Sequence, residues 1–210
     1  MSARRVRTAI LISGRGSNMM ALVEAARAPG FPAQIALVLS NRPEAAGLAF
    51  AKAQGIAAAA VDHRIFAGRD AFEAGMQAVL DIHRIELICL AGFMRLLTPG
   101  FVARWQGRLL NIHPALLPAF KGLDTHARAL AAGVDEHGCT VHHVAAGMDE
   151  GAPVMQARVP VLPGDTPQTL AARVLAQEHL LYPKALALAA GALRQWPAAK
   201  LPLRLPRDGV

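Results

Sequence analysis

The sequence predicts a single doubly wound α/β domain with a mostly parallel, open sheet. Short β-branched or leucine-rich runs alternate with longer alanine-rich segments, which is the pattern of βαβ units. The 210 residues show no internal repeat or linker and are enough for one well-buried core. A hydrophobic fraction of 53% with 18% charged residues excludes a disordered chain. Such sheets bind ligands beyond the carboxyl ends of their strands.

Apolar runs separated by amphipathic segments predict the elements of the first half of the chain. The segment at 18–28 reads as a helix that stops before Pro29, and 69–83 reads as a helix with Phe72, Met76 and Leu80 on one face. The expected strands are 8–13, 34–39, 58–61, 87–91 and 108–112.

The pattern loosens after Pro118 and then predicts two more strands and a final helix. The strands, 139–144 and 154–161, flank a glycine-bounded loop at 147–151. The helix begins at Thr166 with proline at its first helical position, and we expect it to end near Tyr182, before Pro183.

Composition limits the partners and the compartment. The excess of 22 Lys+Arg over 15 Asp+Glu gives a charge of +7, which favours nucleic acid, an anionic membrane surface or a small phosphorylated substrate. An aromatic content of 5% argues against base stacking on nucleic acid. The apolar stretch at 9–12 is too short for export or membrane crossing, and Cys89 and Cys139 sit in apolar runs as expected of buried free thiols. We therefore expect a cytoplasmic protein.

A glycine-rich turn follows the first predicted strand. The stretch Ser-Gly-Arg-Gly-Ser-Asn at 13–18 brings flexible backbone, side-chain donors and a helix amino terminus together, which favours phosphate binding. A dinucleotide site is disfavoured because Met19 occupies the third glycine position and Ser40-Asn41 replaces a ribose-binding acid. An ordinary strand-to-helix turn stays the alternative.

The fifth predicted strand carries a polar pair at its carboxyl end. The period of two in an extended chain puts Asn111 and His113 on one face, with Ile112 opposite, and Pro114 stops the strand. An amide and an imidazole would then face a ligand, although two polar residues capping a strand end are an equally good interpretation.

Two carboxylates and an arginine are further candidates. The glycines around Asp149 would let it point inward, but a solvated turn uses the same residues. Glu178 falls on the apolar stripe of the last helix, where it needs a ligand or a neighbouring arginine as a partner. Arg95 follows a strand and is either a ligand contact or a surface residue.

Several chemistries lack their residues. The sequence has no Gly-x-Ser-x-Gly elbow and no cysteine beside a histidine, so a protein nucleophile is unsupported. It has no His-Glu-x-x-His, and adjacent His142 and His143 point to opposite faces of their strand, so no metal site is expected. The remaining acid/base and oxyanion groups suit a transferase whose substrate supplies the attacking group.

Six motifs carry a resemblance over nearly the whole chain. They are Leu-Ile-Ser-Gly-Arg-Gly-Ser-Asn at 11–18, Ala-Gly-Phe-Met-Arg-Leu-Leu at 91–97, Leu-Asn-Ile-His-Pro-Ala-Leu-Leu-Pro at 110–118, His-Gly-Cys-Thr-Val-His at 137–142, Met-Asp-Glu-Gly at 148–151 and Gln-Glu-His at 177–179. On these motifs the chain resembles the folate-dependent glycinamide ribonucleotide formyltransferases of purine synthesis, which have a Rossmann-like fold.

The resemblance implies the reaction and a role for each motif residue. The glycinamide amine would attack the formyl carbon of 10-formyltetrahydrofolate, the cosubstrate, without a metal. Asn111 and protonated His113 would stabilise the oxyanion, and Asp149 would raise the histidine pKa and move protons. The ribonucleotide would be held by Gly16, Ser17, Asn18 and Glu178, and the folate by Arg69, Met94, Arg95, Leu96, Leu97 and Asn111.

The resemblance also implies how the domain is divided. Residues 1–115 would form the phosphate-binding half, 116–190 the catalytic loop and folate-side half, and 191–210 a tail. The implied partners are small molecules rather than nucleic acid or membrane, and the protein would be a monomer or homodimer. Lys121, Asp124 and the stretch at 152–154 depart from the family pattern and leave that loop conformation open.

Three other functions compete with this interpretation of the sequence. Formyltetrahydrofolate hydrolases and methionyl-tRNA formyltransferases share the Asn-Ile-His-Pro block, but they carry an extra domain for which 210 residues leave no room. A non-catalytic phosphate or nucleic-acid binding module is the third, and it predicts strongly salt-dependent binding.

Overall fold

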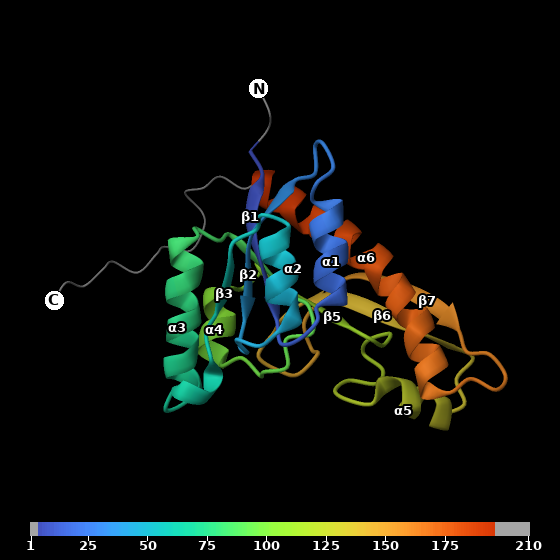
Figure 1. Cartoon of the computed structure of the whole chain (residues 1–210). Helices are drawn as coiled ribbons and strands as arrows, with labels where there is room; N and C mark the ends of the chain where they lie inside the picture. The colour runs from blue at the N-terminus through green and yellow to red at the C-terminus, as the bar shows by residue number, and fades with distance from the viewer. Residues whose placement is uncertain (1–3, 196–210) are drawn as a thin grey trace.

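The computed structural model describes residues 4–195 as one α/β domain (Figure 1). The part of the expected tail at 196–210 lies outside the described residues. The strands form one seven-stranded sheet in the order β3-β2-β1-β4-β5-β6-β7. Their bounds are β1 Val6–Ile12, β2 Ala33–Ser40, β3 Ala58–Ala60, β4 Leu87–Leu90, β5 Leu109–His113, β6 Glu136–His143 and β7 Pro153–Pro160.

The sheet is parallel from β3 to β5. Strand β6 pairs antiparallel with β5, and β7 pairs antiparallel with β6. The predicted mostly parallel, doubly wound sheet is therefore confirmed. The helices are α1 Ser17–Ala25, α2 Ala46–Ala53, α3 Arg69–Ile82, α4 Pro99–Arg104, α5 Thr125–Ala131 and α6 Pro167–Gln195, with a 3₁₀ turn η1 at His63–Ile65.

Alternation along β1 separates two hydrophobic cores, one on each face of the sheet. Ile10 and Ile12 pack in the core that also holds α1, α2 and α6, whereas Ala9 and Leu11 pack in the core that holds α3 and α4. Figure 1 shows α6 running beside α1, with α3 and α4 on the other side. Strand order reverses at β1, so the chain winds both ways from this strand and leaves the carboxyl ends of β1 and β4 open to a ligand.

The last helix is longer than the sequence predicts. It begins as expected, with the Thr166 hydroxyl accepting from the Thr169 N–H at 3.2 Å, but it continues through Pro183 to Gln195. Proline removes one backbone donor, which costs helix stability. The apolar stripe is buried on both sides of it, at Tyr182 and Leu186, and this packing holds the helix together.

Tyr182 fastens this helix to the middle of the sheet. Its ring is fully buried, and its hydroxyl lies 3.0 Å from the carbonyl oxygen of Leu90 and 3.2 Å from that of Leu110. Leu90 is the last residue of β4, and Leu110 is the second residue of β5.

None of the helices within residues 4–195 has both the length and the hydropathy required to cross a bilayer.

We expect Tyr182→Phe to lower the free energy of unfolding by about 1–2 kcal/mol, because two buried carbonyls lose a shared donor while the ring still fills its space. Urea unfolding of the two proteins measures the difference. Equal unfolding midpoints and slopes would show that the hydroxyl does not fasten α6.

Candidate active site

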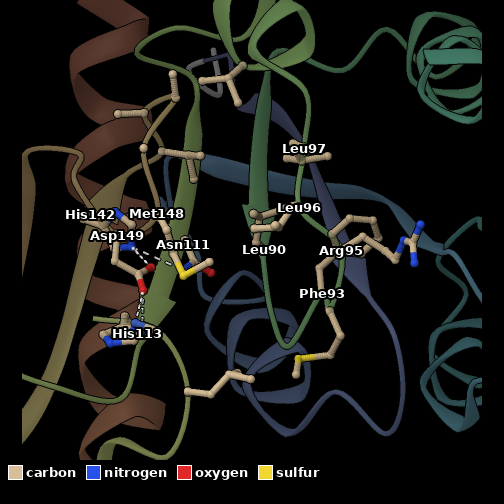
Figure 2. A pocket seen from close by; sticks show the side chains of 18 residues that line it. Leu90, Phe93, Arg95, Leu96, Leu97, Asn111, His113, His142, Met148 and Asp149 are labelled. Atoms are coloured by element: carbon tan, nitrogen blue, oxygen red, sulfur yellow. Dashed lines mark hydrogen bonds and ion pairs between the residues drawn. The ribbon is translucent and has the colours of Figure 1, made fainter. Parts of the chain in front are cut away.

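A pocket of about 430 Å³ opens at the carboxyl ends of β4 and β5. One wall is the loop after β4, and the other is formed by β5, the end of β6 and the loop that follows (Figure 2). The pocket brings together seven residues that the sequence nominated: Met94, Arg95, Leu96, Leu97, Asn111, His113 and Asp149.

Strand β5 presents Asn111 and His113 to this pocket, as the period of two predicts. Ile112, between them, packs in the hydrophobic core on the opposite face. The Asn111 amide nitrogen lies 3.2 Å from Nε2 of His142. The amide is therefore held in place by a residue of the neighbouring strand.

His113 is buried, and oxygen atoms face both of its ring nitrogens. Nδ1 lies 3.3 Å from a carboxylate oxygen of Asp149, and Nε2 lies 2.9 Å from the carbonyl oxygen of Phe120. A protonated imidazole can donate to both oxygens at once, whereas a neutral ring can donate to only one. Each ring nitrogen of His113 thus has one oxygen within reach, from Asp149 on one side and Phe120 on the other.

Asp149 turns toward the histidines from the loop between β6 and β7. It accepts a hydrogen bond from the Gly122 N–H at 2.9 Å, and its second oxygen lies 3.6 Å from Nε2 of His142. Burial raises the pKa of Asp149, but the hydrogen bonds from His142 and Gly122 and the charge of His113 outweigh it and lower the pKa below its ordinary value. The carboxyl group is therefore ionised at neutral pH.

Gly151 lets the Asp149 loop fold back closely on β6. A Cβ at this position would lie 1.5 Å from the carbonyl oxygen of His143, so any larger residue would push the loop away from the strand. Asp149 itself adopts a left-handed conformation with φ of 54°, which Asp tolerates better than most residues.

His142 is the site residue that sequence reasoning missed. The adjacent histidines served only to argue against a metal site, yet His142 is buried in the pocket wall between Asn111 and Asp149. The antiparallel pairing of β5 with β6 places it directly opposite Asn111. If segments 109–113 and 136–143 are assumed to pair, the register of that pairing points to His142 as a neighbour of Asn111.

The residues that depart from the family pattern have structural partners. Lys121 pairs with Glu150 at 3.2 Å, and the two side chains are exposed. Asp124 precedes α5 with φ of 55°, and Pro153 begins β7. The Lys121–Glu150 pair thus joins the loop before α5 to the loop that carries Asp149, which still contacts His113.

A second candidate site lies at the end of β1. Gly16, with φ of 71°, leads into α1, which starts at Ser17. The first backbone N–H groups of a helix have no partners within it, so this turn presents free donors to an anion. Gly47 of α2 packs against the turn and donates its N–H to the Gly14 carbonyl at 3.2 Å.

Glu178 and Asn18 form a buried pair beside this turn. The Asn18 amide nitrogen donates to Glu178 at 2.7 Å, while the Asn18 side-chain oxygen has no hydrogen-bond partner among the described residues. Burial raises the pKa of Glu178, and the bond from Asn18 only partly offsets it. The partner that Glu178 needs is therefore an asparagine of the neighbouring helix rather than an arginine.

Arg69 is not part of the pocket wall. It is the exposed first residue of α3, and the pocket ends at the loop after β4. Its contact with folate stays a prediction. Within residues 4–195, histidine, cysteine and acidic side chains form no group of three or more that could hold a metal ion.

The pocket can therefore support general acid and base chemistry around an amide donor. Asn111 offers an N–H, His113 and Asp149 can exchange a proton, and apolar side chains of the loop after β4 exclude water from one wall. No serine or cysteine lines it, which favours an attacking atom supplied by a substrate.

Comparisons with known proteins identify relatives of the whole domain. The model of the formyl transferase family matches residues 6–186. The chain is 42% identical over 174 residues to phosphoribosylglycinamide formyltransferase of Escherichia coli, covering 83% of this chain and 82% of that one. It is 47% identical over 211 residues to the trifunctional purine biosynthetic protein adenosine-3 of Drosophila pseudoobscura, but spans only 15% of that protein.

Solved structures show the same likeness. The structure superposes on phosphoribosylglycinamide formyltransferase from Brucella melitensis with a TM-score of 0.86 and 56% identity, covering 89% of this chain and 96% of that one. Glycinamide ribonucleotide transformylase 1 from Symbiobacterium toebii also gives a TM-score of 0.86, at 44% identity, covering 90% of this chain and 89% of that one.

We expect the buried His137 of β6 to make the stability of the domain depend on pH. The His137 ring is buried and packs edge-on against the His126 ring, with 5.2 Å between the two ring centroids. Neither nitrogen of His137 has a hydrogen-bond partner among the described residues. Burial and, to a smaller degree, the charge of His126 lower the pKa of His137 from 6.5 to about 4.

Between pH 6.5 and 4, His137 is therefore protonated in the unfolded chain but neutral in the folded protein. The free energy of unfolding falls as the pH falls through this range. We expect His137→Phe to lose less melting temperature than the unsubstituted protein between pH 7 and pH 4.5. Parallel melting curves for the two proteins would disprove this source of acid sensitivity.

Proposed function

The chain belongs to the formyl transferase family, and on this premise we propose that it transfers the formyl group of 10-formyltetrahydrofolate to the amine of glycinamide ribonucleotide. The products are formylglycinamide ribonucleotide and tetrahydrofolate, a step of purine synthesis. The observation that carries the proposal is the contact of His113 with Asp149 beside Asn111 in a pocket that no serine or cysteine lines.

The pocket suits the folate. Its volume of about 430 Å³ lies within the range of small-molecule sites, and its lining is mainly apolar with a few converging polar groups. Met94, Arg95, Leu96 and Leu97 form the wall opposite Asp149, where the flat ring system would lie between them. The formyl carbon would then face Asn111 and His113.

Each side chain has a defined task in the transfer. The amine attacks the formyl carbon, and the negative charge that develops on the formyl oxygen is stabilised by the Asn111 N–H and by protonated His113. The amine gives up a proton and the departing folate nitrogen takes one, with His113 and Asp149 as the carriers. His142 orients the Asn111 amide for this task.

The turn at the end of β1 supports the ribonucleotide end of the same proposal. Gly16, Ser17 and the backbone of Asn18 would bind the phosphate at the amino terminus of α1. Glu178, held by Asn18, would accept hydrogen bonds from the ribonucleotide. The division into a phosphate-binding half and a folate-side half, the choice between monomer and homodimer, and the cytoplasmic location stay predictions.

The direct test is to mix the protein with 10-formyltetrahydrofolate and glycinamide ribonucleotide and to identify the products. We expect formylated ribonucleotide in step with tetrahydrofolate, and no turnover when the ribonucleotide is omitted. Release of free formate without the ribonucleotide would instead favour a hydrolase of the same fold.

We expect Asn111→Ala to lower kcat by about 10²- to 10³-fold, the loss produced when one oxyanion donor is removed from an enzyme. An unchanged melting temperature is the control that the pocket still forms. Normal turnover of the folded variant would remove Asn111 from the oxyanion role.

A further inference from the structure

The loop at 93–98, which joins β4 to α4 and forms one pocket wall, is held by few contacts. Within the described part of the chain, no backbone-to-backbone hydrogen bond reaches residues 93–97. Met94 and Leu96 are 66% and 61% exposed, so burial does not fix them, although Phe93 and Leu97 pack on the hydrophobic core. The position of this wall therefore depends on bonds from side chains elsewhere.

Ser13 makes the first of these bonds. Its hydroxyl oxygen accepts the backbone N–H of Met94 at 2.8 Å and donates its own proton to the side-chain oxygen of Asn41 at 2.6 Å. Ser13 and Asn41 are 7% and 1% exposed, so water does not compete for either bond. Because Asn41 takes the only hydroxyl proton, a lone pair of Ser13 is left for Met94.

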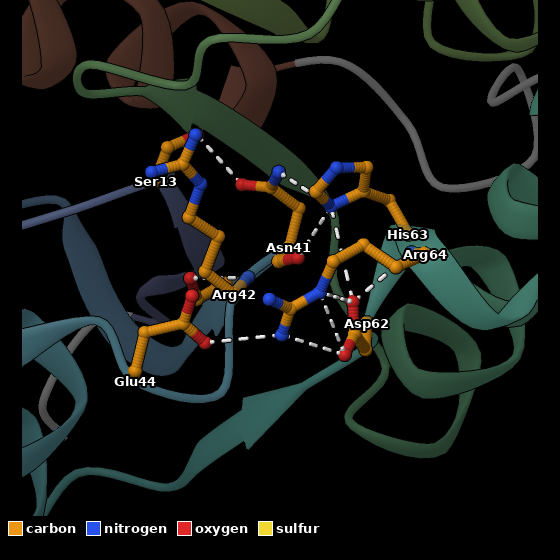
Figure 3. A network of polar contacts seen from close by, with 8 residues as sticks. Ser13, Asn41, Arg42, Glu44, Asp62, His63 and Arg64 are labelled. Atoms are coloured by element: carbon orange, nitrogen blue, oxygen red, sulfur yellow. Dashed lines mark hydrogen bonds and ion pairs between the residues drawn. The ribbon is translucent and has the colours of Figure 1, made fainter.

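Asn41 is itself held from the other side (Figure 3). Nδ1 of His63 lies 2.9 Å from the backbone oxygen of Asn41 and 3.2 Å from its amide nitrogen. Next to it, Asp62 and Arg64 form an ion pair at 2.8 Å that fastens the η1 turn. His63 therefore anchors Asn41, and the side-chain oxygen of Asn41 accepts from the Ser13 hydroxyl.

Glu73 makes the second bond, at the far end of the loop. This residue of α3 is 5% exposed, and its carboxylate accepts the backbone N–H of Thr98 at 2.7 Å and the Thr98 hydroxyl. Thr98 in turn caps α4 by accepting from the Phe101 N–H at 3.2 Å. The loop is thus fixed at Met94 and at Thr98, and the residues between them face the pocket.

We propose that Ser13 and Glu73 are positioning residues for the folate: they touch no substrate but fix the loop at 93–98 against which the folate binds. The inference rests on the proposed function, because it takes the pocket to be the folate site. No known role of the catalytic side chains requires either residue.

The location of Ser13 makes the expected effect specific. It is the first residue of the glycine-rich stretch at 13–18, three residues before Gly16, and its backbone N–H donates to the Gly92 carbonyl at 3.1 Å without needing the hydroxyl. Removing the hydroxyl should therefore release Met94 without releasing the turn. Loss of folate affinity with intact ribonucleotide affinity is then the signature of positioning, whereas general loosening of the fold would weaken both.

The experiment compares Ser13→Ala and Glu73→Ala with matched controls. Thr8→Val also removes a buried hydroxyl from β1, but this hydroxyl bonds only to the Val6 carbonyl, at 3.2 Å, far along the strand from the pocket. Glu73→Gln keeps an oxygen for the Thr98 N–H and offers a donor to the Thr98 hydroxyl. The measurements are kcat, KM for each substrate, and the Kd of tetrahydrofolate by calorimetry.

We expect each alanine variant to raise KM for 10-formyltetrahydrofolate and Kd for tetrahydrofolate about five- to tenfold, because the buried hydrogen bonds that fix one end of the loop are lost. We also expect kcat and KM for the ribonucleotide to change less than about twofold, with Thr8→Val like the unsubstituted protein and Glu73→Gln restoring most of the affinity that Glu73→Ala loses.

Unchanged folate affinity in both alanine variants would overturn the proposal, and so would an equal loss of affinity for both substrates. Failure of the unsubstituted protein to bind tetrahydrofolate is a different result, because it would overturn the proposed function itself. If Ser13→Ala does not fold, Glu73→Ala against Glu73→Gln still decides whether the loop is positioned in this way.

Discussion

The antiparallel pairing of β6 with β5 is the constraint on which the site depends. In a purely parallel sheet every connection crosses back to the amino ends of the strands, but here β6 lies antiparallel beside β5, the strand that carries Asn111 and His113. The register sets His142 opposite Asn111 and lets the loop after β6 emerge over the end of β5, where Asp149 meets His113. A shift of one residue would turn His142 away from the pocket.

Burial gives this cluster its chemical character. The side chains of His113 and Asp149 are 6% and 11% exposed, so their attraction is little screened by water. A buried polar or charged group is stable only with hydrogen-bonding partners. His113 and Asp149 are partners of each other, the Phe120 carbonyl faces His113, and the Gly122 N–H donates to Asp149. The cluster is therefore preorganised to hold a proton close to the place where negative charge would develop.

Helix α6 joins the two candidate substrate sites to one support. Glu178 reaches Asn18 beside the turn at the end of β1, and one helical turn further on Tyr182 reaches the carbonyl oxygens of Leu90 in β4 and Leu110 in β5. Because both contacts come from the same rigid element, the distance between the two sites is fixed by the helix. Pro183 lies directly after this segment, and the buried side chains on both sides of it keep α6 continuous.

The sequence by itself predicted the fold class, the strand faces and seven of the residues that the pocket brings together. Strand alternation placed Asn111 and His113 together, the helical period placed Glu178 on a buried stripe, and glycines marked the turns at Gly16 and Gly151. These features depend on neighbours a few residues apart, whose spacing is set by the repeats of 2 and 3.6 residues. The motif resemblance added the family, which the comparisons confirmed.

Only the tertiary structure decided which of these faces meet. The contacts of Asn18 with Glu178, of Ser13 with Met94 and of His142 with Asn111 join residues 160, 81 and 31 positions apart. Such contacts follow from strand order and register, which local periodicity does not specify. For the same reason the continuation of α6 through Pro183 and the place of Arg69 outside the pocket wall could not be predicted: packing against distant segments outweighs local preference.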